Sequence, residues 1–310
     1  MTSSAERPVS AAVGRATLLT ALAPASWGTF YVVTTELLPP GHPLFAALLR
    51  ALPAGLLALA IGRTLPRGAV WWGRAAALGV LNIGLTFPLL TVAAERLPGG
   101  VAATLAAAQP LAVALLAAVV LGERPTPWRL GWGVAGMAGV GLVVLGPAAA
   151  FDAAGVAAGF GSAASMALGV TLTRRWGRPA GTGPAAFAGW QLTAGGLFLL
   201  PVTLLGEGPP PPVDAPAVLG YLWLGLIGGL LAFVLWFRGL TTLPVTSVAV
   251  LVLLSPLVAA VLGAVLLGQT LGPVQLVGFA LALAAILAGQ LPSGVSGRVP
   301  RRADRSRAEG

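Results

Sequence analysis

Residues 97–127 read LPGGVAATLAAAQPLAVALLAAVVLGERPTP, and residues 243–273 read LPVTSVAVLVLLSPLVAAVLGAVLLGQTLGP. Both stretches have a Leu-Pro opening, a central proline and a Leu-Gly close. The match extends without a gap over residues 78–130 and 224–276, where 19 of the 53 paired positions are identical. Compositional bias does not explain the matched glycines and prolines, because each of these residues has a specific backbone role. The chain is therefore a tandem duplication.

The composition indicates that both copies lie in a membrane. Of the 310 residues, 57% are hydrophobic and only 9% are charged, whereas about a quarter of a soluble domain is charged. A membrane-spanning helix needs about 20 apolar residues, so the chain has room for ten. The absence of cysteine excludes disulfides and thiolate metal sites, and we expect no cofactor and no bound metal.

Ten apolar runs separated by turn residues predict an all-α integral membrane protein with ten transmembrane helices. The runs fall at about 16–36, 43–62, 73–94, 98–121, 128–147, 152–173, 184–205, 216–238, 243–268 and 272–291. We assign residues 16–147 to the first five-helix repeat and 152–291 to the second. The tails are residues 1–15 and an arginine-rich segment, 292–310, which we expect to be disordered.

The distribution of arginine predicts the orientation. With a cytoplasmic N-terminus, 16 of the 18 arginines fall on the inner side, as the positive-inside rule requires. Only Arg96 lies in an outer loop, and Arg50 lies within a span. The sequence thus predicts a multi-pass protein of a bacterial inner membrane with both termini cytoplasmic. Since each copy has an odd number of spans, the two copies must be inverted, an arrangement on which many transporters base alternating access.

The paired motifs resemble those of the drug/metabolite transporter superfamily, specifically its EamA-type ten-helix members. The similarity rests on Leu97-Pro98, Pro110 and Leu121-Gly122-Glu123-Arg124 in the first copy, on Leu243-Pro244, Pro256 and Leu267-Gly268-Gln269 in the second, and on Trp27-Gly28 and Arg50. The second copy departs from the pattern at Gln269, where an acid is usual. The resemblance implies a secondary transporter of small polar metabolites, with an amino-acid or metabolite exporter as the first expectation and an uptake carrier for a sugar-like or other metabolite as the alternative.

Arg50 is the first candidate for a substrate contact, because an arginine inside a span costs several kcal/mol unless it faces water, a partner or a ligand. It could bind an anionic group in a central cavity, or it could snorkel outward or pair with Glu36 or Glu95. With an offset of 141 residues, Arg50 corresponds to Gln191, which follows Trp190. Polar side chains at the same depth in both copies favour a cavity.

Further candidates come from polar and aromatic residues near mid-span. Trp27 and Tyr31 share a helical face and could wall a substrate site, or they could be packing aromatics. A buried Asn82 could contact substrate or join two helices. The remaining predicted substrate-binding residues are Gln109, Ser165, Trp190 and Gln191. Pro110 and Pro256 lie at symmetric mid-helix positions and predict helix kinks.

The sequence lacks residues and motifs that several classes of membrane protein need. No Asp or Glu lies near the middle of a predicted span, and there is no phosphate-binding loop, so catalysis and ATP drive are not expected. The expected partners are a small-molecule substrate and membrane lipid, without nucleic acid. A coupling ion and a homodimer formed through glycine-rich faces stay open. A non-transporting lipid-handling or scaffold protein and a solute channel are the alternatives from other classes.

Overall fold

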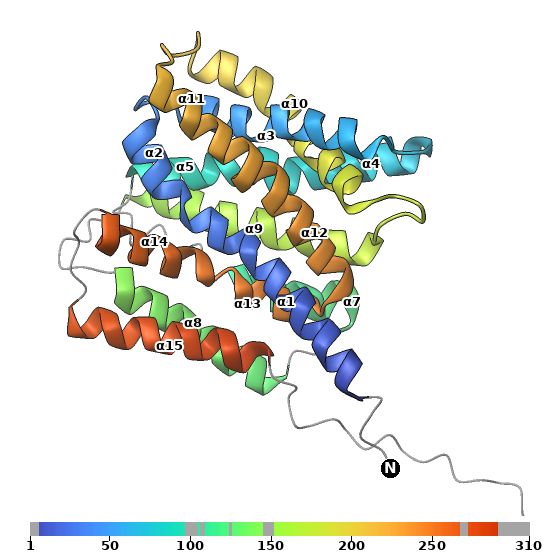
Figure 1. Cartoon of the computed structure of the whole chain (residues 1–310), viewed down its shortest axis with the longest axis vertical. Helices are drawn as coiled ribbons and strands as arrows, with labels where there is room; N and C mark the ends of the chain where they lie inside the picture. The colour runs from blue at the N-terminus through green and yellow to red at the C-terminus, as the bar shows by residue number, and fades with distance from the viewer. Residues whose placement is uncertain are drawn as a thin grey trace, which may run out of the picture.

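The computed structural model describes residues 6–96, 105, 109–123, 126–144, 152–266 and 272–290. Every regular element in this part of the chain is helical, which confirms the predicted all-α class. Among the described residues, seven helical stretches are long and apolar enough to cross a membrane. Together with α7, α8 and α15 they occupy the positions of the ten predicted spans (Figure 1).

The elements of the first repeat follow the predicted apolar runs. They are α1 (Glu6–Gly28), α2 (Phe30–Leu37), α3 (Pro43–Gly62), α4 (Gly68–Gly79), the π-helix η1 (Val80–Leu85), α5 (Thr86–Arg96), α7 (Gln109–Leu121) and α8 (Pro127–Val144). One span is thus α1 with α2, and another is the continuous series α4–η1–α5.

The second repeat is built in the same order. Its elements are α9 (Ala153–Trp176), α10 (Pro184–Gly206), α11 (Ala215–Leu222), the π-helix η2 (Trp223–Leu231), α12 (Ala232–Thr242), α13 (Val245–Leu251), α14 (Leu254–Leu266) and α15 (Pro273–Gln290). Here α11–η2–α12 is one span, and α13 with α14 is the next.

Helix pairing follows the inverted symmetry. The second spans of the two repeats, α3 and α10, pack against each other, and so do the fifth spans, α8 and α15, which lie side by side at one edge of the bundle (Figure 1). The contact between α5 and α9 has its counterpart in that between α12 and α1. A two-fold axis in the membrane plane requires such reciprocal pairs.

Glycines permit the close approach of the paired helices. A Cβ atom added to Gly55 of α3 would overlap the backbone nitrogen of Thr193 in α10. Gly196 of α10, its counterpart by the offset of 141, would meet the Cβ of Leu52 at 2.7 Å. Small residues therefore bring the two backbones together from both sides, as is common between membrane helices.

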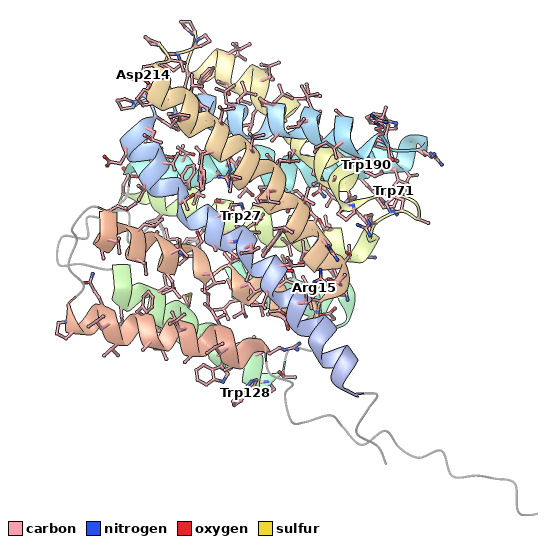
Figure 2. The ribbon with its side chains drawn as sticks, viewed as in Figure 1. Arg15, Trp27, Trp71, Trp128, Trp190 and Asp214 are labelled. Carbon is pink, nitrogen blue, oxygen red and sulfur yellow. The ribbon has the colours of Figure 1, made fainter. Side chains whose placement is uncertain are left out.

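The ends of the bundle differ in charge. One end, called here the arginine-rich end, carries these described arginines: Arg15, Arg63, Arg67, Arg74, Arg129, Arg174, Arg175, Arg178 and Arg238. The opposite end, called the acidic end, carries Glu36, Asp152, Glu207 and Asp214, with Arg96 beside Asp152. Figure 2 shows Arg15, Trp71 and Trp190 toward one end and Asp214 at the other.

The π-helices occupy matched places in the two repeats. The offset of 146 residues carries η1, residues 80–85, onto residues 226–231 of η2. A π-helical turn widens the helix by one residue and disturbs its regular hydrogen bonding, and such turns often occur at functional sites. Both turns lie near the middle of their spans, where the central cavity is found.

Candidate functional site

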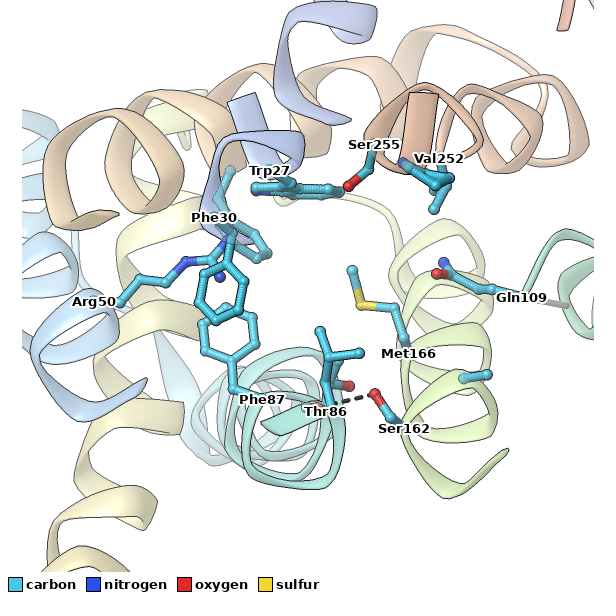
Figure 3. Close-up of a pocket in the computed structure, with 14 residues that line it drawn as sticks. Trp27, Phe30, Arg50, Thr86, Phe87, Gln109, Ser162, Met166, Val252 and Ser255 are labelled. Atoms are coloured by element: carbon cyan, nitrogen blue, oxygen red, sulfur yellow. Dashed lines mark hydrogen bonds between the residues drawn. The ribbon is translucent and has the colours of Figure 1, made fainter. Parts of the chain in front are cut away.

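A cavity of about 110 Å³ lies inside the bundle, and we call it the central cavity. Both repeats contribute to it, through α1, α2, α3, α5, α7, α9, α12, α14 and the break between α13 and α14. Its described lining consists of Trp27, Phe30, Arg50, Thr86, Phe87, Leu90, Gln109, Ser162, Ala163, Met166, Phe233, Val252, Ser255 and Pro256 (Figure 3). None of these residues is acidic, so Arg50 supplies a positive charge that no lining carboxylate balances.

Arg50 is fixed by backbone and aromatic contacts. Only 6% of the residue is exposed, and its Nη2 donates to the carbonyl oxygen of Gly228 at 3.2 Å. The guanidinium carbon lies 4.4 Å from the ring centroid of Phe87 and 5.4 Å from that of Phe30. These are cation–π distances, which stabilise a desolvated guanidinium. The Nε atom is buried and has no hydrogen-bond partner within the described structure, so the side chain retains donor capacity for a ligand.

Trp27 donates to the same oxygen. Its Nε1 lies 3.0 Å from the carbonyl oxygen of Gly228. Its ring packs on Phe233 and Trp236, with centroid distances of 5.2 and 5.1 Å. Gly228 belongs to η2, where the π-helical turn disturbs the regular backbone ladder and presents this carbonyl to side chains of other helices. The wide turn thus holds the indole and the guanidinium together.

The wall of the central cavity opposite Arg50 carries a neutral polar side chain, Gln109. Gln109 enters from α7 and faces the cavity across from Arg50 (Figure 3). It is 6% exposed, and its Nε2 has no partner among the described residues. The Ser162 hydroxyl, by contrast, is used internally, since it donates to the backbone oxygen of Thr86 at 3.0 Å. The cavity thus offers a cation at one side, an unsatisfied amide at the other and aromatic rings between them.

A second contact of the same kind occupies the symmetry-related position. Gln191 is the counterpart of Arg50, and Asn82, in η1, is the counterpart of Gly228. Asn82 Nδ2 donates to Gln191 Oε1 at 2.8 Å and to Thr173 Oγ1 at 3.4 Å. Both amide side chains are fully buried. Each π-helix is therefore tied to the second span of the other repeat, by an arginine in one case and by a neutral amide pair in the other.

Not all predicted site residues meet in the central cavity. Trp27, Arg50 and Gln109 line it, whereas Asn82, Ser165, Trp190 and Gln191 do not. Ser165 donates to the carbonyl oxygen of Leu81 at 2.8 Å, and Trp190 Nε1 donates to that of Thr64 at 2.7 Å, at the arginine-rich end. The polar groups of Ser165 and Trp190 are thus hydrogen-bonded within the protein. The side chain of Tyr31 lies outside the described part of the structure.

The structure describes the helix around one of the two predicted kinks, at Pro256, but only part of the helix around the other, at Pro110. The span that contains Pro256 is interrupted at Val252 and Leu253, between α13 and α14. Pro256 has no amide hydrogen for a bond to Val252, and Ser255 N donates to that oxygen instead, at 3.0 Å. In the first repeat α7 begins at Gln109, and residues 106–108 lie outside the described part, so a bend at Pro110 stays a prediction.

Several lining residues were not singled out from the sequence. Phe30 follows Trp27 by three residues, so the two rings lie on the same side of the first span and line the cavity together. Phe87 and Phe233 occupy matched positions of the duplication, so their identity was a usable signal. The sequence does not predict the role of the Gly228 carbonyl, because helix geometry and not residue type decides which backbone oxygen can accept a hydrogen bond from a side chain.

Comparison with known proteins gives a consistent family assignment. The sequence model described as the EamA-like transporter family matches residues 14–145 and 153–288. Protein PecM of Dickeya dadantii is 44% identical over 265 residues, which cover 86% of this chain and 89% of that protein. The threonine/homoserine exporter RhtA of Escherichia coli is 32% identical over 217 residues, covering 69% and 68%. A probable terminal-alkyne amino-acid exporter of Streptantibioticus cattleyicolor is 33% identical over 210 residues, covering 64% and 66%.

Proposed function

The chain belongs to the EamA-like transporter family, and from this premise we propose that it exports small amino acids or related carboxylate-bearing metabolites. It is a multi-pass membrane transporter with ten helices in two inverted repeats. The substrate class and the direction are the proposal. The observation that carries it is the buried guanidinium of Arg50 in a cavity whose described lining contains no carboxylate.

An arginine at the middle of a membrane helix costs about 2.5–3.5 kcal/mol on insertion scales. The contacts of Arg50 with Gly228 and the two rings offset part of this cost but supply no negative charge. A substrate carboxylate would supply one, through a charge-assisted hydrogen bond to a guanidinium that still has free donors. The same positive charge disfavours cationic substrates.

The rest of the cavity supports a small substrate with an apolar part. Trp27, Phe30, Phe87 and Phe233 present ring surface, and the volume of about 110 Å³ is small beside the roughly 300–1,000 Å³ of pockets that hold drug-sized ligands. Gln109 Oε1 is an acceptor for a substrate ammonium group. Two of the relatives bear names of amino-acid exporters, which favours the same class here.

The transport cycle follows from the inverted repeats. Exchange of the two repeat conformations would turn a cavity open at one end into a cavity open at the other. We propose that the arginine-rich end is cytoplasmic, in accord with the positive-inside rule, and that the protein lies in the bacterial inner membrane with both termini in the cytoplasm. Export then runs from the arginine-rich end to the acidic end.

Counterflow in proteoliposomes tests this function. Vesicles are loaded with a mixed pool of amino acids, small organic acids, sugars and nucleosides, and exchange against labelled members is read by mass spectrometry. We expect saturable exchange of amino acids or other carboxylates. Exchange of sugars alone would favour the carrier of neutral metabolites, and non-saturating passage would favour a channel. No exchange by folded protein would contradict the proposal.

A further inference from the structure

A second cavity opens at the arginine-rich end, and we call it the vestibule. Its volume is about 550 Å³. The vestibule is lined by Glu123, Arg129, Arg174, Thr242, Leu243, Pro244 and Thr246. These residues come from the loop after α7, from α8 and α9, and from the junction of α12 with α13, so both repeats contribute.

The two arginines are held in place but not saturated. Arg129 Nη1 donates to Thr246 Oγ1 at 2.9 Å, and Arg174 Nη1 donates to the backbone oxygen of Leu240 at 3.2 Å. A guanidinium group has five N–H donors. Arg129 Nε is buried and has no partner within the described residues. Both side chains therefore retain donors for an anionic group.

Glu123 brings the opposite charge to the same cavity. No ion pair joins it to Arg129 or Arg174, although all three side chains line the vestibule in the part of the chain that the structure describes. The vestibule thus presents two cations and an anion that do not neutralise one another by direct contact. An α-amino acid carries the complementary pair of charges, a carboxylate and an ammonium group, on one small molecule.

The vestibule is a neighbour of the central cavity. Thr246, in α13, lines the vestibule, whereas Val252, just beyond α13, lines the central cavity. Six residues of helix span about 9 Å. All seven residues of α13 are buried, so this short helix fills the space between the two cavities. A ligand bound in the vestibule would lie next to the central cavity, on the side of the arginine-rich end.

We propose that the vestibule is a second binding site, specific for zwitterionic amino acids, from which the central cavity is loaded. Arg129 and Arg174 bind the α-carboxylate, and Glu123 binds the α-ammonium group. The inference rests on the proposed function, because it takes the transported class to be amino acids. It adds a site outside the central cavity, with its own residues.

The absence of cysteine makes the site directly testable. Thr242 is exposed and lines the vestibule, so Thr242→Cys places a single thiol there. The measurement is the rate at which a charged methanethiosulfonate reagent modifies this thiol in purified protein. A pool of the L-amino acids at about four times its Kd should slow the reaction about fivefold, because only protein without bound ligand reacts. The pools of their methyl esters and of their N-acetyl derivatives each lack one charge and should protect much less.

Second substitutions in the Thr242→Cys protein show which residues the amino acid needs in order to protect the thiol. Arg129→Gln and Glu123→Gln should each abolish it, whereas Arg238→Gln, which removes an exposed arginine of the same end outside the vestibule lining, should not. Glu123 has no ion pair with the vestibule arginines, so its substitution is not expected to impair folding. Equal protection by the three pools, or protection that survives both lining substitutions, would overturn the proposal.

A last variant distinguishes binding in the vestibule from binding in the central cavity. Arg50→Ala should abolish transport but leave the protection of Thr242→Cys intact, because Arg50 does not line the vestibule. If protection disappears in Arg50→Ala, the ligand was bound in the central cavity and the vestibule site is refuted. If protection is normal but wild-type protein exchanges no amino acid, the proposed function fails and the binding site stands.

Discussion

Trp27 and Arg50 donate to one oxygen atom, the backbone carbonyl of Gly228, although they lie in different helices of the first repeat and Gly228 lies in the second. This three-way contact joins the repeats at the wall of the central cavity. Any rearrangement that moves η2 relative to the first two spans must break at least one of the two hydrogen bonds. In the proposed function, the carbonyl oxygen of Gly228 therefore positions the substrate-binding Arg50 and also takes part in the motion of the repeats.

Loss of the indole donor should weaken substrate binding. In Trp27→Phe the oxygen of Gly228 keeps only Arg50 as a partner, so the guanidinium is held more strongly there and is less available to a ligand. We expect KM to rise about 2–10-fold, the range that corresponds to one neutral hydrogen bond. Transport kinetics in proteoliposomes measure this.

Trp128→Phe is the matched control for that substitution. Trp128 Nε1 donates to the backbone oxygen of Ala288 at 3.0 Å, and Trp128 does not line the central cavity. Its substitution removes an indole hydrogen bond of the same length away from the cavity and should leave KM unchanged. A similar rise of KM in both variants would contradict the assignment of the effect to the Gly228 contact.

The buried amide pair should behave as a coupled unit. Asn82→Ala leaves Gln191 Oε1 without its 2.8 Å donor, and Gln191→Ala leaves Asn82 Nδ2 without its closest acceptor. A double-mutant cycle on unfolding free energy should give a coupling of about 0.6–1.7 kcal/mol, as for other hydrogen bonds between membrane helices. Thr203, about 18 Å further along α10, supplies the control. Asn82→Ala and Thr203→Ala should be additive, and an additive Asn82–Gln191 pair would contradict the prediction.

Two glycines of α8 should respond oppositely to alanine. A Cβ at Gly139 would lie 2.7 Å from the backbone nitrogen of Ala282 and 2.8 Å from the carbonyl oxygen of Gly278, both in α15. The backbones must separate, so we expect Gly139→Ala to cost about 1–3 kcal/mol. A Cβ at Gly131 meets nothing within 4 Å, and Gly131→Ala should be neutral or stabilising by up to about 1 kcal/mol. Thermal unfolding in detergent distinguishes the two, and equal shifts of Tm would refute the packing argument.

Asp152 predicts a small pH dependence at the acidic end. The N–H group of Gly155, which donates to its carboxylate at 2.8 Å, lowers the pKa of Asp152 below its ordinary value, and Arg96 at 3.6 Å adds to this. A lowered pKa means that the charged form stabilises the fold above the unfolded-state pKa of about 3.9, and that this is lost as pH falls through the folded-state value. Asp152→Ala should therefore reduce the decline of Tm below about pH 4. An unchanged pH profile would show that the charge of Asp152 does not stabilise the fold.

The fold could be predicted from sequence because it depends on patterns that sequence records. Apolar runs of about 20 residues and the distribution of arginine predict ten spans, and the duplication with an odd number of spans implies the inversion. The matched prolines and glycines of residues 78–130 and 224–276 made the repeat visible. Pair contacts such as α3 with α10 then follow from symmetry.

The site could be predicted only in part. The sequence predicts Arg50, Trp27 and Gln109 because a polar or aromatic residue inside a span is unusual, and the structure places all three in the lining of the central cavity. Their role in binding stays a prediction. The predicted contacts Asn82 and Gln191 hydrogen-bond to each other and do not line the central cavity. Which buried polar residues pair with one another depends on helix rotation, which the sequence does not record. The π-helices, and with them the carbonyl of Gly228, follow from backbone geometry that local residue types do not encode.

In the proposed function, Arg50 binds the carboxylate of the transported molecule. The most direct test of this contact is the KM for counterflow of the most active amino acid, in Arg50→Gln and in the matched control Arg238→Gln. Loss of a charged hydrogen bond of about 1.5–3 kcal/mol predicts that KM rises about 10–100-fold in Arg50→Gln and is unchanged in Arg238→Gln. A folded Arg50→Gln protein that transports the amino acid with the wild-type KM would show that Arg50 does not bind the substrate carboxylate.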